Sequence, residues 1–177
     1  RENIFNPLGL HDTGWHLRDL DTSRVIFSYS FSPDDIVPVY RKTYHFGEPG
    51  YPAGMVRTTM DDFSRFLIMI MNHGRHGDVQ LLKPSTIDLM LSPQNIPNMT
   101  SRSFRLIDKS LCWLMIETNG SQYYEMNGFS GSIFTDALYS VEKGTGMIYY
   151  FSGINMKNMM AVPEIVNTLD KVLEQAN

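Results

Sequence analysis

This sequence is poor in cysteine, in long hydrophobic runs and in basic charge. Its single cysteine, Cys112, excludes an internal disulfide bond and lies in the apolar run 111–116, where we expect it to pack as a small hydrophobic side chain. No apolar run reaches the roughly 18 residues that a membrane-spanning helix needs. The formal net charge of −4 gives no reason to expect a nucleic-acid partner. We therefore expect no disulfide scaffold, no membrane segment within this chain and no basic binding face.

The chain does contain enough apolar residues for a packed core. Its 177 residues are 42% hydrophobic and 19% charged, which is typical of a globular protein and is enough for one domain or for half of a larger one. It begins at Arg1 with neither an initiator methionine nor a signal-peptide pattern, so we expect a further segment to precede it. Any targeting signal would lie in that segment, and the localisation stays open.

A kinked loop followed by a well-delimited helix stands out near the middle of the chain. The loop, at 51–54, reads Tyr-Pro-Ala-Gly, and the helix is expected at 60–73. Thr58 or Thr59 can cap its N-terminus, and Gly74 suits the position just after its last turn. Its apolar residues recur at helical spacing and predict one buried stripe, made of Phe63, Phe66, Leu67, Ile70 and Met71.

The second half of the chain changes from helical to strand-like patterns. Runs rich in β-branched and aromatic residues predict four antiparallel strands, at 111–117, 123–126, 131–138 and 147–152. Asn119-Gly120 and 142–144 are typical of hairpin turns, and Pro163 opens a last helix. This order indicates an α+β fold. We expect 1–109 to form helices and loops along one cleft wall and 110–177 to form the sheet with a helix across it, together one incomplete domain.

Four segments occur in an order that is more specific than any one of them. They are Ile4-Phe5-Asn6-Pro7-Leu8-Gly9-Leu10 with Asp12-Thr13, Tyr51-Pro52-Ala53-Gly54 with its helix, Leu81-Leu82-Lys83-Pro84, and Gly128 to Gly131. This order resembles the serine β-lactamases and penicillin-binding-protein-like hydrolases, chiefly the class C branch with its esterases and D-amino-acid peptidases. The resemblance covers nearly all of this chain but only the C-terminal half of such a protein. It implies a β-lactamase/transpeptidase-like fold with part of the helical subdomain.

The same resemblance implies chemistry whose central motifs this sequence lacks. The family hydrolyses esters or amides through an acyl-enzyme, without a cofactor, using a Ser-x-x-Lys and a Tyr-x-Asn motif that normally precede the Pro-Leu-Gly segment. Both would lie before Arg1, so we expect this chain alone to be inactive. The one Ser-x-x-Lys match, Ser140 to Lys143, falls in a predicted hairpin turn, whereas the motif acts at the start of a buried helix. We do not assign the nucleophile to Ser140.

The family's third motif, Lys-Thr-Gly or His-x-Gly, aligns with Met126-Asn127-Gly128, and Met126 departs from it because a thioether supplies no cation. The resemblance implies that the Phe129 N–H is an oxyanion donor. It also implies substrate-binding residues on two segments, namely Met126, Asn127, Gly128, Tyr51, Ala53 and Gly54. Met126 either packs in its strand within a degraded site or belongs to a working variant of the site.

Two function hypotheses follow, and neither uses a metal. The histidines show no metal-ligand spacing with a third ligand. The first hypothesis is a fragment of a serine hydrolase whose small-molecule or peptide-like substrate binds in a cleft shared with a missing N-terminal half. The second is a non-catalytic binding or assembly protein, a pseudoenzyme with a degraded site. In either case the missing strands would leave a sheet edge exposed, and we expect self-association through it.

Overall fold

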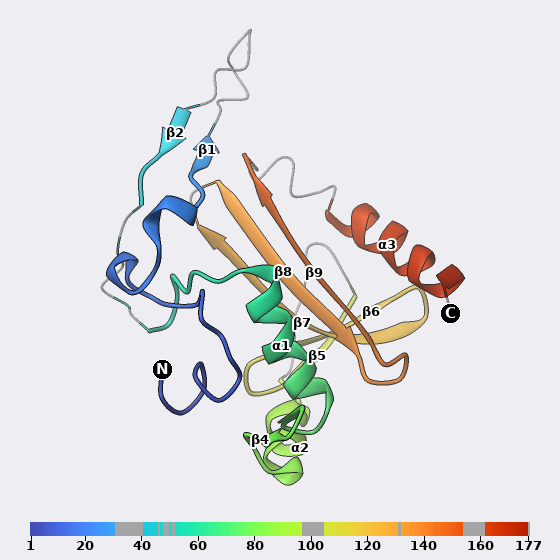
Figure 1. Ribbon diagram of the computed structural model, residues 1–177. Helices are drawn as coiled ribbons and strands as arrows, with labels where there is room; N and C mark the ends of the chain where they lie inside the picture. The colour runs from blue at the N-terminus through green and yellow to red at the C-terminus, as the bar shows by residue number, and fades with distance from the viewer. Residues whose placement is uncertain are drawn as a thin grey trace, which may run out of the picture.

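The computed structural model is described for most of the chain, with several gaps. The described residues are 1–30, 41–45, 47, 50, 52–96, 105–130, 132–153 and 162–176. The main strands are β5 (Arg105–Lys109), β6 (Leu114–Thr118), β7 (Ser121–Ser130), β8 (Ile133–Ser140) and β9 (Thr145–Ser152). They form one antiparallel sheet in the order β5-β6-β7-β8-β9, so each strand pairs with the next in sequence (Figure 1). The expected antiparallel α+β architecture is confirmed.

The sheet contains one strand more than the sequence predicted. The four expected strands correspond to β6 to β9, and β5 is additional. Three of the five residues in its sequence, Arg-Leu-Ile-Asp-Lys, are charged, and they lack a clean alternation. Its pairing with β6 shifts register between Leu106 and Asp108. The sheet therefore begins within the region 1–109 that was expected to hold helices and loops.

The hairpin turns follow from local backbone preferences. Asn119 and Gly120 both have positive φ angles, 48° and 75°, which is the geometry that a two-residue hairpin requires. Between β8 and β9 the Gly144 N–H donates to the Ser140 carbonyl at 3.0 Å, with Gly144 at φ 64°. Both predicted turns are confirmed.

The turn between β5 and β6 corrects the expectation for Cys112. The Ser110 N–H donates to the Trp113 carbonyl at 2.8 Å, and the Trp113 N–H donates to Ser110 Oγ at 3.2 Å. This closed turn places Leu111 and Cys112 at its tip, where both are exposed. Trp113, the next residue, is buried and carries the packing instead.

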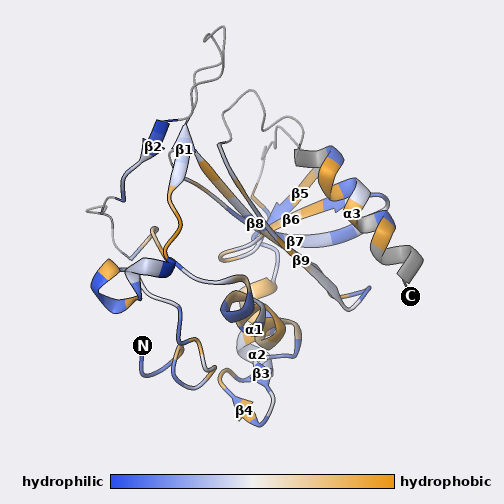
Figure 2. Ribbon diagram, turned by 45° about the horizontal axis from the view of Figure 1, so that its top comes forward, coloured by the Kyte–Doolittle hydropathy of each residue, from blue (hydrophilic) through white to orange (hydrophobic). Residues whose placement is uncertain are grey.

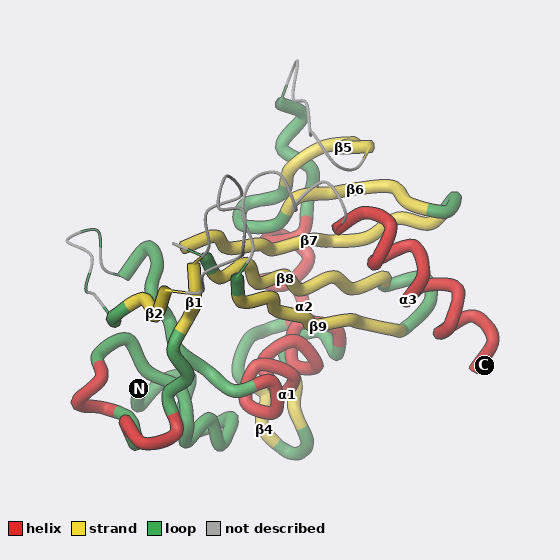
Figure 3. Tube along the Cα trace, turned by 90° about the horizontal axis from the view of Figure 1, so that it is seen from above, coloured by secondary structure: helices red, strands yellow, loops and turns green. Residues whose placement is uncertain are grey.

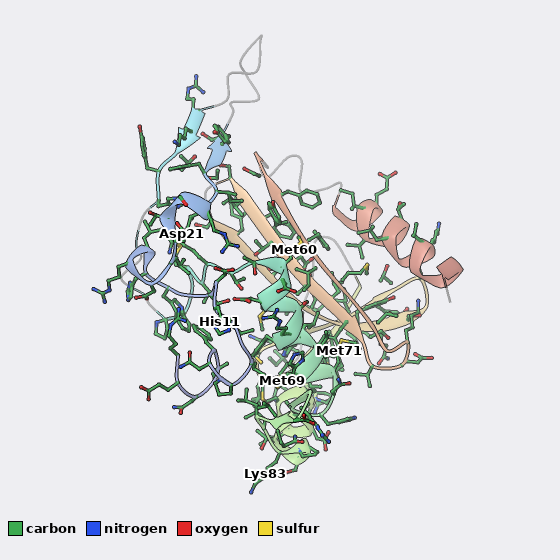
Figure 4. All side chains as sticks on the ribbon, viewed as in Figure 1. His11, Asp21, Met60, Met69, Met71 and Lys83 are labelled. Atoms are coloured by element: carbon green, nitrogen blue, oxygen red, sulfur yellow. The ribbon has the colours of Figure 1, made fainter. Side chains whose placement is uncertain are left out.

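Helix α1 (Met60–Met71) begins as its sequence predicts but ends two residues before the expected His73, with Asn72 as its C-cap. The Thr59 hydroxyl accepts the Asp62 N–H at 3.1 Å, so Thr59 is the N-cap. Gly74 has φ 88°, and a Cβ there would lie 2.2 Å from the Leu82 carbonyl oxygen, so only glycine fits. The predicted buried stripe is only partly right, since Phe63, Phe66 and Met71 are half-buried. Met69, which the predicted stripe did not include and which Figure 4 labels, is fully buried.

Two hydrophobic layers cover the two faces of the sheet. One face packs on α1 and α2 (Pro84–Leu91), with Trp113 and Tyr139 in the core. The other packs on α3 (Val162–Ala176), with Ile116 and Leu138 beneath Val166. Figure 3 shows the five strands side by side, with β5 at one edge and α1 beside β9 at the other.

The apolar side of α3 is less buried than its sequence predicts. Val166 is fully buried, but Ile165 and Leu169 are over a third exposed and Val172 is 56% exposed. Figure 2 shows alternating hydrophobic and hydrophilic segments along this helix. The helix therefore presents a second, partly uncovered apolar stripe in addition to the one that touches the sheet.

The first third of the chain lies against α1 and one end of the sheet. It contains two short 3₁₀ helices and the β1–β2 hairpin, and a further two-stranded ribbon, β3–β4, follows α1. Their bounds are Leu17–Asp19, Thr22–Arg24, β1 Ser28–Ser30, β2 Arg41–Thr43, β3 Arg75–His76 and β4 Val79–Gln80. Gly14 and Arg57 exchange two backbone hydrogen bonds of 2.9 Å, and the Tyr29 N–H donates to Ser152 Oγ at 3.4 Å. These bonds tie the first third to the segment before α1 and to the end of β9.

Candidate functional site

The candidate site lies on the part of β7 that has only one strand neighbour. β6 pairs with β7 as far as Leu114 opposite Glu125, whereas β8 pairs with β7 up to Ser130. Within the described residues, 126–130 thus have β8 on one side and no strand on the other. An unpaired strand edge presents alternate backbone N–H and C=O groups that a ligand can bind. Phe129, the predicted oxyanion donor, belongs to this free-edged segment.

Strand alternation sends the site residues to opposite faces of the sheet. Met126 packs against the core cluster on the side of α1 and α2, and Gly128 pairs with Thr135 on that same face. A Cβ at Gly128 would lie 3.0 Å from Thr135 Oγ1, so the absent side chain keeps the strand close to its neighbour. Asn127 and Phe129 lie on the α3 face, and both are exposed.

The structure brings the proline-containing loop to the end of this strand. Ser130 Oγ donates to Met55 Sδ at 3.8 Å, which joins β7 to the residue that follows Gly54. Met55 itself has φ 67°, an uncommon conformation for a side chain of this size. Arg57 supports it by donating to the Met55 carbonyl at 3.2 Å and to the Trp15 carbonyl at 2.7 Å. The end of the loop therefore meets the end of β7, while a shared substrate site on the two segments stays a prediction.

The remaining loop residues are only partly placed. Ala53 is exposed, Gly54 is half-buried, and the Ala53 N–H donates to the Gly50 carbonyl at 2.9 Å. Tyr51, the other substrate-binding residue that the resemblance implied, lies outside the described residues.

A buried pair of carboxyl groups lies directly behind the candidate site, and the sequence gave no sign of it. Glu125 and Asp136 are only 4% and 2% exposed, on the sheet face that α3 covers. Asn127 Nδ2 donates to Glu125 Oε1 at 3.0 Å, and the Tyr149 hydroxyl donates to Asp136 Oδ2 at 2.5 Å. The sequence alone does not show this pair, because Glu125 and Asp136 come together only through the register of β7 and β8. That register places Asp136 opposite Asn127, two residues along β7 from Glu125.

The surroundings of this pair favour the protonated forms. Burial raises the pKa of Glu125 above its ordinary value. Burial, and then the neighbouring Glu125 carboxylate, raise the pKa of Asp136 to about 8. Burial, and then Asp136, also raise the pKa of Tyr149, so its hydroxyl remains a donor. Behind the exposed Asn127 there is thus a site where a proton is strongly held.

Ser140 and Lys143 do not form a nucleophile–base pair in this structure. Ser140 is fully buried at the end of β8, and its hydroxyl accepts the backbone N–H of Lys143 at 3.3 Å. The Lys143 ammonium instead lies 5.6 Å from the centre of the Tyr123 ring. The hairpin predicted for this Ser-x-x-Lys match is confirmed, and it lies at the opposite end of β8 from Ile133, which pairs with Ser130.

A hollow lies elsewhere, at the other end of β7. Its volume is about 540 Å³, and it runs between the end of α1, α2 and the β8–β9 turn. Its rim includes His73 and Asp88, whose ionisable groups are 4.0 Å apart. Gln122 and Tyr124 at the start of β7 line it, so it does not adjoin 126–130.

Across the described ranges, no group of three or more His, Cys, Asp or Glu side chains is placed to hold a metal ion. None of the described helices is both long enough and apolar enough to cross a bilayer. The centres of the His45 and Phe27 rings lie 4.8 Å apart, with the ring planes tilted by 32°. Burial, followed by the charges of Arg57 and Lys42, lowers the pKa of His45. This histidine is thus held by local packing.

Comparison with solved structures places this arrangement in a known fold. The D-amino acid amidase from Ochrobactrum anthropi SV3 complexed with D-phenylalanine matches 100% of this chain and 52% of its own, with a TM-score of 0.74 at 16% identity. Its complex with L-phenylalanine amide matches 99% of this chain and 50% of its own, with a TM-score of 0.73 at 16% identity. The chain has the β-lactamase/transpeptidase fold.

A penicillin-binding protein from Bacillus halodurans shares this fold more distantly. It matches 93% of this chain and 47% of its own, with a TM-score of 0.59 at 14% identity. This chain therefore spans about half the length of the solved structures that it matches. No protein-family model matches its sequence, and no curated protein does so either.

Proposed function

We propose that this chain is the C-terminal half of a serine hydrolase that cleaves an ester or amide through an acyl-enzyme. The Ser130–Met55 contact carries this proposal, because it joins the free-edged end of β7 to the loop 52–55. Its support is the β-lactamase/transpeptidase fold, shared with a D-amino acid amidase and a penicillin-binding protein over about half of their lengths.

In this proposal the described residues supply one wall of a cleft. The Phe129 N–H binds the developing oxyanion from the free edge of β7, and Gly128 allows the substrate backbone to approach. Asn127 offers its amide to a small-molecule or peptide-like substrate. The Ser-x-x-Lys and Tyr-x-Asn groups come from the remaining half, so the isolated chain is inactive.

The uncovered surfaces suit such a second half. β9 has no strand partner along its outer edge within the described residues, and Tyr150 on it is 47% exposed. α3 presents the apolar side chains of Ile165, Leu169 and Val172. We propose that the remaining half covers both surfaces, and that without it the chain self-associates through the β9 edge. Light scattering that finds a stable folded monomer at micromolar concentration would contradict this part of the proposal.

The decisive experiment uses the protein encoded by the whole gene. We expect the coding sequence before Arg1 to contain Ser-x-x-Lys followed by Tyr-x-Asn. We expect a fluorescent penicillin or a fluorophosphonate to label the full protein covalently, and replacement of that upstream serine by alanine to abolish labelling. Ser140→Ala is the matched control within this chain and should label normally. Labelling that depends on Ser140 would overturn the assignment.

A second function, non-catalytic binding, is favoured by Met126. Its thioether supplies no positive charge where related hydrolases have Lys or His, and the side chain packs into the core cluster. If the full protein binds a substrate analogue without acylation, this second function replaces the first. Met126→Lys separates the two, because a degraded but intact site should gain affinity for a carboxylate ligand, whereas a working variant site should lose activity.

A further inference from the structure

The Glu125–Asp136 pair lacks the groups that buried carboxylates normally require. The ionisable groups on this face of the described sheet and on α3 include Tyr149 on β9, Lys109 on β5, and Glu164 and Lys171 on α3. Tyr123 on β7 lies on the same face, and the Lys143 ammonium lies 5.6 Å from the centre of its ring. Lys109 lies two strands away from Glu125, beyond Leu114, and Glu164 and Lys171 are exposed. No described cation therefore neutralises the pair, and two bare carboxylates at this depth would repel each other strongly.

One oxygen atom indicates how the pair is satisfied. Asp136 Oδ2 accepts the Tyr149 hydroxyl, but Asp136 Oδ1 is buried and accepts no hydrogen bond from any described group. The carboxyl group beside it is that of Glu125, which has no donor of its own unless it is protonated. A proton bound by either group would supply the missing hydrogen bond and remove one of the two charges.

We propose that Glu125 and Asp136 share one proton at neutral pH, and that this proton fixes the Asn127 amide and the free end of β7. Glu125 is the last β7 residue that pairs with β6, and its carboxylate accepts the Asn127 amide at 3.0 Å. Loss of the proton drives Glu125 away from Asp136. The displacement passes directly to 126–129, because no strand holds their outer edge within the described residues. The contribution of Asn127 to substrate binding rests on the proposed function, whereas the shared proton does not.

The test follows the backbone and side-chain amides of this strand by NMR as pH rises from about 6 to about 10. In the wild-type chain we expect Gly128, Phe129 and the Asn127 side-chain amide to share one inflection, near the pKa of about 8 that burial and Glu125 give Asp136. Asp136→Asn should abolish it, and Glu125→Gln should move it to lower pH, because burial alone then raises the pKa of Asp136. Glu142→Gln, which changes an exposed carboxylate in the β8–β9 turn, is the matched control and should retain it.

A measurement on the unmodified chain covers the case in which a variant does not fold. Infrared spectroscopy should detect the carbonyl stretch of a protonated carboxylic acid at neutral pH, and this band should disappear through the same pH range. An absent band, or an inflection that survives in Asp136→Asn or does not move in Glu125→Gln, overturns the inference. Because neither readout uses a substrate, a full protein that resists acylation would remove the proposed function and leave this result intact.

Discussion

Asp62 and Asp136 are almost equally inaccessible, at 3% and 2% exposed, yet their surroundings are opposite in kind. Asp62 Oδ2 accepts the Asp12 N–H and the Thr13 hydroxyl, both at 2.8 Å. Asp62 Oδ1 lies 3.5 Å from the Arg65 guanidinium. The first turn of α1 also places this carboxylate near the positive end of the helix dipole.

Asp136 has no such set of donors and no described cation beside it. Its partners are the Tyr149 hydroxyl, the Ala137 N–H and a second carboxyl group. The comparison shows that burial alone does not determine whether a carboxylate stabilises or destabilises the fold. At α1 the carboxylate joins the first third of the chain to the helix and stabilises the fold, whereas at β7 and β8 it is a destabilising group that the fold tolerates.

Removing the well-satisfied carboxylate should have the largest effect. Asp62→Ala leaves the Asp12 N–H without its acceptor, removes one of the two partners of the Thr13 hydroxyl and takes one of two carboxylates away from Arg65. We expect a loss of about 3 kcal/mol in the free energy of unfolding, measured by urea denaturation. Asp62→Asn keeps one acceptor oxygen and should lose less. A loss of only a few tenths would place Asp62 among ordinary surface residues and end the contrast.

Removing the charge of Asp136 should change the free energy of unfolding in the opposite direction. Asp136→Asn should stabilise the chain, by on the order of 2 kcal/mol in weakly alkaline solution. The pKa of Asp136 is about 8 in the folded chain and about 3.9 when unfolded, so the folded state binds more protons between these values. Wild-type stability therefore falls as pH rises from about 4 to about 8, and the advantage of the variant grows over that range. Urea denaturation at several pH values tests the sign, and an advantage that shrinks with rising pH contradicts it.

A smaller loss is expected from Tyr149→Phe. This change removes the hydroxyl that donates to Asp136 Oδ2 and leaves the ring packed between Phe134 and Phe151. We expect a loss of about 1 kcal/mol near neutral pH, because a buried carboxyl oxygen loses its donor. Thermal unfolding measures it. In the Asp136→Asn background, Tyr149→Phe should lose less stability than it does in the wild-type chain. Equal losses in the two backgrounds would show that Tyr149 and Asp136 are not coupled.

The smallest effect should come from Asp61, the exposed neighbour of Asp62. Asp61 pairs with Arg65 at 2.6 Å, but its side chain is 75% exposed, so solvent screens the interaction. Asp61→Asn should change the unfolding free energy by about 0.3 kcal/mol. Higher salt should reduce even this difference in urea denaturation. A change comparable to that of Asp62→Ala would mean that burial does not separate the two adjacent carboxylates.

Features fixed by short-range rules were predictable from the sequence. Thr59 caps the start of α1, Gly74 follows shortly after its end, and Asn119-Gly120 closes a hairpin, because each acts within a few residues of its own position. Each of the four motifs is also readable from a few neighbouring residues, and their order along the chain indicated the fold. Met126 to Phe129 and the loop residues Tyr51, Ala53 and Gly54 were assigned to one site through that order. The contact between Ser130 and Met55 lies at the ends of these two segments, and the assignment itself stays a prediction.

Features that depend on distant pairing were not predictable. The partners of Asp62 lie 49 and 50 residues away, and nothing around Asp62 in sequence distinguishes this use from helix capping. The Glu125–Asp136 pair exists only because of the register between β7 and β8. β5 was missed because its own residues alternate poorly, so its place in the sheet depends on its pairing with β6.

The arrangement of the sheet also sets an order of assembly. Each strand from β5 to β8 pairs with the one that follows it, across a turn of a few residues. The meander therefore forms from contacts that are local in sequence. The bond from Tyr29 to Ser152 instead closes a loop of 123 residues. Because the entropy of closing a loop grows with its length, we expect the first third of the chain to dock after the meander has formed. During that interval the end of β9 would be open to any other chain that offers a strand.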